Sequence, residues 1–324
     1  MILILSTPHD DDTNLVIEHL SNLKEKFIRI NDLDIFTGKT KFDFKLLDTI
    51  ELTVENPFFG KRDLSEVTCV WYRKFGFFEK YKHLLENVKN DEALRFLESE
   101  HRSTLEMFFH FLRGKKWLNN YFHVRDNSKI SILNYAIRVG LDIPYTHITN
   151  YSSENSINPA HSYITKPIKD GSVVNAEDKI YFFLTKKIEY SEIIENTSFF
   201  PSLFQKNIQK EYELRVFHLN GKNYPMAIFS QNDEQTETDF RQYNYQKPNR
   251  MIPYQLPAEI DNKINKLMKA IKLETGSIDL IKGCDGKYYF LEVNPSGQFR
   301  MTSFPCNYNL HFEVAQYLQR LNKK

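Results

Sequence analysis

Long apolar runs are missing from this 324-residue chain, and none approaches the roughly 20 residues that a membrane-spanning helix needs. The apolar segment Met1–Leu5 is followed at once by Pro8, His9 and three acidic residues, and no basic region precedes it. It therefore predicts a first strand and not a signal peptide. We expect a protein that does not insert into a membrane.

Cysteine is scarce and the net charge is small. The three cysteines, Cys69, Cys284 and Cys306, are odd in number and widely spaced. This argues against a disulfide framework or a zinc site and favours a reducing cytoplasm. A net charge of +1 provides no electrostatic reason to expect binding to nucleic acid or to an anionic membrane. A hydrophobic fraction of 41% with mixed charges is typical of a globular protein.

Periodic patterns predict an α/β fold, and the length is sufficient for two or three domains. The first part alternates short strands with amphipathic helices and ends in a long helix at 90–112, which Gly114 terminates. A second part begins near Asp126 and a third near Pro201. The expected strands lie at 2–6, 27–30, 67–72, 162–168, 180–185, 214–219 and 224–230, and the expected helices at 12–24, 90–112, 128–138, 257–271 and 310–321.

The most informative segment is 276–295, where two apolar-rich runs flank Asp285-Gly286, a strong hairpin signal. With these two residues as the loop, the ladder places Asp279 directly opposite Glu292, and Asn294 points to the same face. Two opposed carboxylates repel each other. A divalent cation would turn this cost into a gain, because Asp, Glu and Asn oxygens bind magnesium together with phosphate oxygens. The segment therefore predicts a metal–nucleotide site.

Three basic residues occupy positions that suit a phosphate group. Lys129 begins the expected helix at 128–138, and Lys166 ends an expected strand. Each lysine by itself is typical of a solvated surface, but an ammonium group also binds phosphate as a point charge. Arg215 shares a strand face with Glu213. This pattern fits either a half-exposed strand with ion pairs or a guanidinium beside a transferring phosphate.

The order of these residues resembles that of the ATP-grasp ligases over essentially the whole chain. The residues that carry the resemblance are Lys129, Lys166, Gln205-Lys206-Asn207-Ile208, Glu213-x-Arg215, Asp279 and Glu292-x-Asn294. Four segments are similar, more narrowly, to the maturases of graspetides, the microviridin and plesiocin ligases: Trp71–Arg73, Gly140–Asn150, Lys210–Val216 and Asn294–Phe299. Ser303–Tyr308 resembles the branch called grasp-with-spasm. The chain departs from microviridin-type ligases after Phe299, so their precursor specificity is not transferred.

This resemblance implies an α/β ATP-grasp fold with α+β lobes. A pre-ATP-grasp domain is expected at 1–125, a central lobe at 126–200 and a C-terminal lobe at 201–324. ATP and Mg²⁺ are the implied cofactors. The implied roles are phosphate contacts for Lys129 and Lys166, a hinge around adenine for Gln205, Lys206 and Ile208, ribose contacts for Glu213, Mg²⁺ ligation for Asp279, Glu292 and Asn294, and catalysis by Arg215 beside the γ-phosphate.

The activity that the resemblance implies is ATP-dependent cyclisation of a ribosomally made precursor peptide. An Asp or Glu side chain is activated as an acyl phosphate, and a Thr/Ser hydroxyl or a Lys amine of the same peptide then forms an ω-ester or an ω-amide. The similarity to grasp-with-spasm favours the ester. Arg241, in the polar segment 231–249, is expected to bind the substrate carboxylate, although a solvated loop arginine fits equally well. The family also suggests a homodimer.

Two other functions are compatible with these residues. An ATP-grasp ligase of a different kind would add free amino acids to a protein tail or a small peptide. The alternative from another class is a nucleotide-binding module without turnover. The complete set of lysine, arginine and carboxylate residues argues against that module.

Overall fold

The chain folds into two compact units in the computed structural model. One unit comprises residues 1–124, 298–303 and 309–324, and the other comprises 125–297 and 304–308. The structure describes residues 1–46, 48–76, 78–151, 161–169, 173–176, 179–182, 185–189, 191–192, 198–231, 244 and 246–323. In these ranges, no helix has both the length and the apolarity that crossing a membrane requires.

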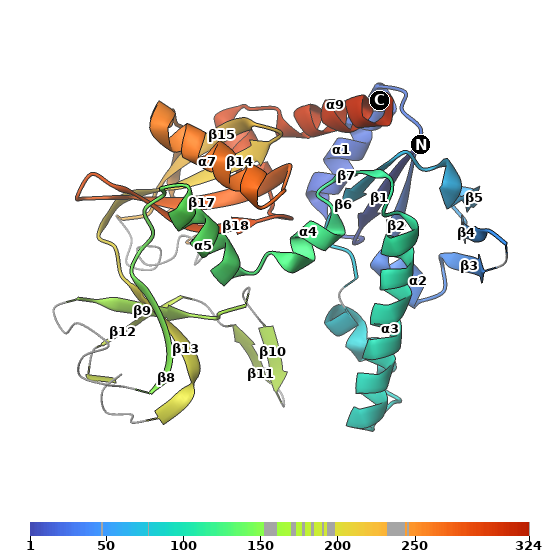
Figure 1. The fold of residues 1–324 in the computed structure, drawn as a ribbon, viewed down its shortest axis with the longest axis horizontal. Helices are drawn as coiled ribbons and strands as arrows, with labels where there is room; N and C mark the ends of the chain where they lie inside the picture. The colour runs from blue at the N-terminus through green and yellow to red at the C-terminus, as the bar shows by residue number, and fades with distance from the viewer. Residues whose placement is uncertain are drawn as a thin grey trace. The chain divides into compact units, whose positions relative to one another are not determined.

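The first unit is built on a parallel four-stranded sheet with the strand order β2-β1-β6-β7 (Figure 1). Its central strand β1 is completely buried, as expected for a strand that is covered on both faces of a parallel sheet. The strands are β1 (Ile2–Ser6), β2 (Phe27–Asn31), β6 (Cys69–Tyr72) and β7 (Lys116–Leu118), and the helices of this unit include α1 (Asp11–Asn22), α2 (Asp32–Phe36), α3 (Asp91–Phe111) and α9 (Leu310–Lys323).

An antiparallel meander, which the sequence patterns did not predict, follows α2. It consists of β3 (Lys41–Leu46), β4 (Ile50–Asn56) and β5 (Gly60–Asp63). Two of its side chains, Leu52 and Val54, are buried in the core of the first unit together with Leu3, Leu5 and Phe108. The outer residues of the meander are largely exposed, which weakens the alternating pattern by which a strand is recognised.

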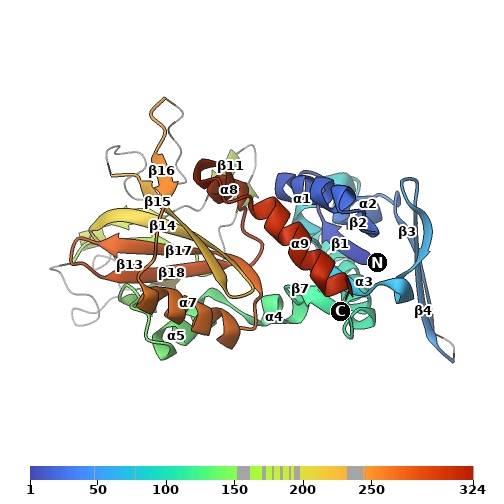
Figure 2. The same ribbon diagram turned by 90° about the horizontal axis from the view of Figure 1, so that it is seen from above.

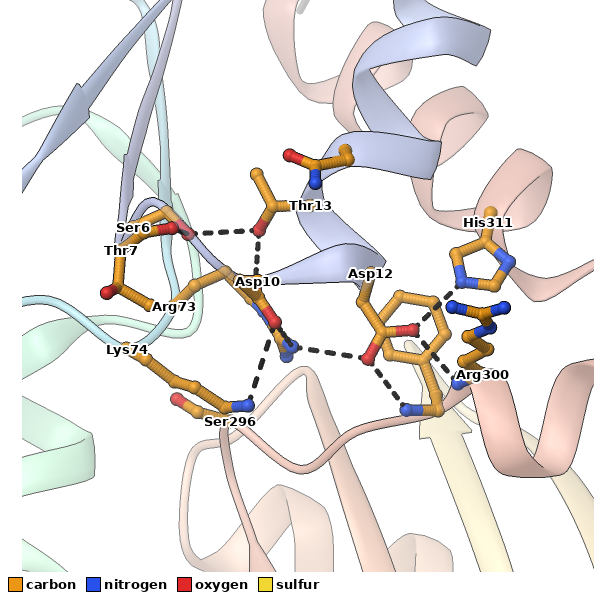
Figure 3. A network of polar contacts seen from close by, with 12 residues as sticks. Ser6, Thr7, Asp10, Asp12, Thr13, Arg73, Lys74, Ser296, Arg300 and His311 are labelled. Carbon is orange, nitrogen blue, oxygen red and sulfur yellow. Dashed lines mark hydrogen bonds and ion pairs between the residues drawn. The ribbon is translucent and has the colours of Figure 1, made fainter.

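The C-terminal segment completes the first unit, although it follows the last strand of the second unit in sequence. Helix α9 packs against α1 (Figure 2). The carboxylate of Asp12, on α1, accepts hydrogen bonds from the backbone N–H groups of Phe299 (3.1 Å) and Arg300 (2.9 Å), and it lies 2.9 Å from His311 Nε2 (Figure 3). One buried acidic side chain thus binds both the start of the C-terminal segment and its last helix.

Arg73 links this carboxylate to a second one. Its Nε donates to Asp10 Oδ2 at 3.0 Å, and its Nη2 lies 3.6 Å from Asp12 Oδ2. Burial raises the pKa of Asp10, but the Arg73 guanidinium and the Thr13 hydroxyl outweigh burial and lower it to about 2. Arg73 is only 3% exposed, so this pair of contacts lies inside the first unit.

Among the described residues, the second unit contains three antiparallel sheets. One is the pair β10-β11. The four-stranded sheet, called the smaller sheet below, has the order β12-β9-β13-β8, and the five-stranded sheet, called the larger sheet below, has the order β16-β15-β14-β17-β18. Helix α5 packs against β18 and against α7 (Figure 1). The elements are α5 (Lys129–Arg138), β8 (Thr146–Tyr151), β9 (Tyr163–Lys166), β10 (Val173–Ala176), β11 (Lys179–Phe182), β12 (Lys186–Ile188), β13 (Ser198–Lys206), β14 (Lys210–Leu219), β15 (Lys222–Phe229), β16 (Arg250–Pro253), α7 (Ala258–Ala270), β17 (Thr275–Gly283) and β18 (Tyr288–Asn294).

Two short helices lie near the borders of the units: α4 (Tyr121–Asp126) and α8 (Arg300–Cys306). Residues 207–209 connect β13 of the smaller sheet to β14 of the larger sheet. Strand β13 runs across position 200, the expected boundary between two lobes, and pairs with β8 and β9 of the smaller sheet. Residues 298–303 and 309–324, within the expected C-terminal lobe, belong to the first unit.

We predict that Asp12→Ala lowers the free energy of unfolding of the first unit by about 3–5 kcal/mol, because it leaves buried donors without their carboxylate. Both tryptophans, Trp71 and Trp117, lie in this unit, so urea unfolding followed by tryptophan fluorescence measures its stability directly. Asp11→Ala is the matched control. The Asp11 side chain is 68% exposed, so a change within about 0.5 kcal/mol is expected. Equal stability of the two variants would contradict the prediction.

Candidate active site

Four charged residues form a row that crosses strands β14, β17 and β18 of the larger sheet and ends on helix α5. On adjacent strands, Arg215 pairs directly with Asp279, and Asp279 pairs with Glu292. Arg215 Nη1 donates to Asp279 Oδ1 (2.8 Å) and Oδ2 (3.0 Å). At the other end, Nζ of Lys129, the first residue of α5, lies 3.3 Å from Glu292 Oε2. The order is cation, carboxylate, carboxylate, cation, so each carboxylate of the repelling pair has a positive neighbour.

The predicted pairing of Asp279 with Glu292 is confirmed, but the hairpin that produces it differs from the prediction. Lys282 pairs with Tyr288, so the loop is longer than the two residues Asp285-Gly286. Gly286 has a φ of +81° and donates its N–H to the carbonyl of Gly283, which is typical of a longer hairpin loop with a left-handed glycine. This loop shifts the register by one residue.

A β-bulge at Leu291 reverses that shift. Leu280 pairs with Phe290 and Asp279 with Glu292, so Leu291 has no partner in the ladder. The two deviations cancel, and Glu292 returns to the face on which Asp279 lies. Asn294 continues the corrected register opposite Ser277, and its Oδ1 accepts a hydrogen bond from the Ser296 N–H. The two carboxylates and the amide thus share one face of the sheet.

A second bulge, at Glu211, brings Lys210 to Glu213. Lys210 pairs with Gly283 and Tyr212 with Lys282, which leaves Glu211 unpaired. Residues three apart on a regular strand point to opposite faces, but here Lys210 Nζ contacts Glu213 Oε1. Ser230 Oγ donates to the same oxygen at 3.0 Å. The sequence analysis assigned no role to Lys210 or Ser230, because strict alternation places Lys210 on the wrong face.

The Glu213 side chain is buried and has little contact with solvent. Burial raises the pKa of this carboxyl above its usual range, and the nearby Asp279 carboxylate acts in the same direction. Lys210 and Ser230 oppose the rise by stabilising the charged form. Oε1 of Glu213 has two protein partners, Lys210 Nζ and Ser230 Oγ.

A pocket between the smaller and the larger sheet of the second unit is lined by most of the predicted site residues. The predicted residues that line it are Lys166, Gln205, Lys206, Ile208, Glu213, Asp279 and Glu292. Lys129 and Arg215 contact the carboxylates of this wall through the ion pairs above, and Asn294 lies two residues beyond Glu292. Arg241 is outside the described residues. Apolar lining comes from residues that the sequence did not single out: Ile164, Ile281 and Leu291.

The residues of this pocket fit a magnesium–nucleotide complex. Within the described ranges, no group of three or more His, Cys, Asp or Glu side chains is placed to hold a metal. Two carboxylates alone suit Mg²⁺, which usually binds one or two carboxylates and completes its shell with phosphate oxygens and water. The apolar walls suit a flat base. The buried Oε1 of Gln205 has no hydrogen-bond donor among the described residues, which leaves an acceptor for a ligand.

We predict that Lys210→Met lowers the free energy of unfolding by about 3 kcal/mol near neutral pH, because the buried Glu213 carboxylate loses its cation. Burial raises the Glu213 pKa in the folded state, so the stability linked to its protonation is complete at low pH and is lost as the pH rises through that pKa. The loss caused by Lys210→Met should therefore shrink as the pH is lowered. Urea unfolding followed by circular dichroism, from about pH 8 to about pH 5, measures it.

Two further variants control this experiment. Lys269→Met removes an exposed lysine of α7 and should change stability by no more than about 0.5 kcal/mol. In Lys210→Met/Glu213→Gln the uncompensated charge is gone, so part of the stability should return. A loss that does not depend on pH, and that the second substitution does not relieve, would contradict the pairing.

Comparisons with known proteins found one matching family and several similar solved structures. The family described as the MvdD pre-ATP grasp domain matches residues 1–125. No curated protein matches the sequence. A solved structure of a RiPP-associated ATP-grasp ligase from Chryseobacterium gregarium, in complex with ADP and a leader and core peptide, is 26% identical; 99% of this chain and 96% of that chain are covered, with a TM-score of 0.80.

Two other structures share the fold. The macrocyclase MdnC from Microcystis aeruginosa MRC, bound with its precursor peptide MdnA, is 24% identical, with 99% and 100% of the two chains covered and a TM-score of 0.81. The ATP-grasp ligase PsnB, complexed with a minimal precursor, Mg and ADP, is 16% identical, with 99% and 97% covered and a TM-score of 0.74. This chain therefore has the ATP-grasp fold, and it resembles the RiPP-associated ATP-grasp ligases that mature graspetides over nearly its whole length.

Proposed function

We propose that this protein is an ATP-dependent macrocyclase of a ribosomally made precursor peptide. The observation that carries the proposal is the charged row of Lys129, Glu292, Asp279 and Arg215 beside the pocket. The likeness to ligases whose structures contain ADP and precursor peptides, over nearly the full length of the chain, supports it.

In this proposal ATP supplies the phosphoryl group, and Mg²⁺ neutralises phosphate charge. Asp279, Glu292 and Asn294 would hold the metal, while Lys129 and Lys166 would contact phosphates and Glu213 the ribose. Two of the cations, Lys129 and Arg215, form ion pairs with the proposed metal ligands Glu292 and Asp279, which supports this assignment. Lys129 and Arg215 would become available to phosphate oxygens if Glu292 and Asp279 ligated a metal ion instead. Metal binding and phosphate binding would be coupled in this way.

The reaction that follows joins two side chains of one peptide. A carboxylate oxygen of the precursor attacks the γ-phosphorus, ADP leaves, and the carboxyl becomes an acyl phosphate. Arg215, which pairs with Asp279 in this structure, would then stabilise the negative charge that develops on the transferring phosphate. A hydroxyl or amine of the same peptide then attacks the acyl carbon, loses its proton and displaces phosphate. We favour the hydroxyl and thus an ω-ester.

The test is mass spectrometry of a cognate precursor after incubation with the protein, Mg²⁺ and ATP. Each bond should remove the mass of one water, and only when ATP is present. Glu292→Gln should slow this reaction by about 100-fold or more, because a metal ligand loses its charge. Glu211→Gln, an exposed residue at a bulge of the same sheet, should react like the wild type. Absence of ATP-dependent water loss, or incorporation of labelled free amino acids instead, would reject the macrocyclase.

Arg241 is proposed as the residue that binds the substrate carboxylate. We predict that Arg241→Ala lowers ligation by about 100-fold, while ADP affinity is unchanged, because a guanidinium holds a carboxylate by charge-assisted hydrogen bonds. Arg250→Ala, which removes an exposed arginine at the start of β16, is the control. Quenched-flow ligation and calorimetric ADP binding separate the two effects. Unchanged ligation in Arg241→Ala would reject this assignment.

The location and assembly of the protein are further proposals. All three cysteines are free, which fits the reducing cytoplasm. We also propose a homodimer, as the resemblance to the graspetide ligases suggests. Sedimentation measurements would determine its mass.

A further inference from the structure

The chain turns sharply directly after β18, at the residues that follow Asn294. The Asn294 side-chain Oδ1 accepts a hydrogen bond from the Ser296 N–H at 3.1 Å, and the Asn294 carbonyl accepts one from the Gly297 N–H, also at 3.1 Å. The first contact fixes the direction of the amide oxygen, and the second closes a four-residue turn. The side chain of Asn294 is therefore held by the turn that follows it.

Gly297 lies so close to the neighbouring strand that a side chain does not fit there. An added Cβ would lie 2.6 Å from both Cβ and Oγ of Ser277, which is 1% exposed on β17 and pairs directly with Asn294. Carbon atoms in contact are about 3.5–4.0 Å apart, so an added Cβ would force the turn or β17 to move. The φ of Gly297 lies outside the left-handed region, so the lack of space, and not the backbone conformation, requires glycine.

A second glycine approaches the same residue from β17. A Cβ at Gly276 would lie 3.3 Å from the Asn294 carbonyl oxygen and 3.0 Å from Val293 Cγ1. A Cβ at Gly297 would lie 3.2 Å from that carbonyl oxygen. The end of β18 thus occupies space that two residues without side chains leave open, and this packing determines where Asn294 lies.

We propose that Gly276, Ser277 and Gly297 are positioning residues for Mg²⁺ binding. They hold the amide oxygen of Asn294 on the face of the sheet that the two carboxylates share. The inference rests on the Mg²⁺ role proposed for Asn294. A carbonyl oxygen has two lone pairs, so Oδ1 can accept from the Ser296 N–H and still bind a cation. Groups that orient a metal ligand without touching the metal typically change metal affinity by about 10- to 100-fold when they are lost.

Titration with Mn²⁺ in the presence of ADP, followed by paramagnetic resonance, tests this positioning without any turnover, because Mn²⁺ takes the same oxygen ligands as Mg²⁺. Gly297→Ala should weaken Mn²⁺ binding by about 10- to 100-fold. ADP binding without metal, measured by calorimetry, should not change, because no residue proposed to contact the base or the ribose is altered. Gly114→Ala is the matched control, since a Cβ at Gly114 meets no described neighbour within 4 Å.

A second substitution, at Ser277, distinguishes positioning from a general loss of stability. Ser277→Gly removes both atoms that the new methyl group would meet, so Ser277→Gly/Gly297→Ala should regain Mn²⁺ affinity to within about 3-fold of the wild type. Ser277→Ala keeps the Cβ, so Ser277→Ala/Gly297→Ala should bind Mn²⁺ as weakly as Gly297→Ala. Because glycine weakens a strand, recovery of metal binding in the first double variant would not come from added stability.

The outcomes separate this inference from the proposed function. A wild-type protein that binds no Mn²⁺ in the presence of ADP would reject the metal site itself. If the wild type binds Mn²⁺ and folded Gly297→Ala binds it equally well, or if the two double variants have equal affinities, the positioning role is overturned. Circular dichroism establishes folding. If Gly297→Ala does not fold, Gly276→Ala decides: it should weaken Mn²⁺ binding several-fold, and an unchanged affinity would overturn the inference.

Discussion

The opposition of Asp279 and Glu292 is the constraint on which the candidate site depends. Two carboxylates in directly paired positions repel each other unless positive charge is close. In this structure that charge comes from Arg215 on one side and Lys129 on the other. The same four side chains would supply metal ligands and phosphate contacts in the proposed ATP complex. The arrangement is therefore balanced without a ligand and also suited to exchange its partners when a magnesium nucleotide binds.

Two irregularities in the strands produce this arrangement. The bulge at Leu291 restores the face on which Glu292 lies, and the bulge at Glu211 brings Lys210 to Glu213. Bulges re-aim side chains at the expense of ladder hydrogen bonds, and they are over-represented beside active sites. Both lie on strands that contribute residues to the pocket. The precision of the site thus comes from local departures from regular pairing on an otherwise ordinary antiparallel sheet.

The C-terminal segment has a different physical role. After β18 the chain returns to the first unit, where Asp12 binds the N–H groups of Phe299 and Arg300 and contacts His311. Asn294 of the candidate metal site lies only a few residues before this anchor in sequence. The last helix therefore belongs to the first unit. Dividing the chain into consecutive segments, such as 1–125, 126–200 and 201–324, separates this helix from the unit to which it belongs.

The sequence by itself determined the sheet and helix types of the main elements, the pairing of Asp279 with Glu292, and the chemical character of the site. These predictions depend on local signals: the alternation of apolar and polar residues, the hairpin dipeptide Asp285-Gly286, and the residue types of the site. Local signals are visible in the sequence without knowledge of the fold. The tertiary structure decided which partners those residues have. Lys210 and Ser230 were missed because their roles depend on bulges and on strands far away in sequence. Asp12 likewise gains its partners Phe299 and Arg300 from the opposite end of the chain, and Arg73 meets Asp10 only because the folded core brings the end of β6 and the start of α1 together.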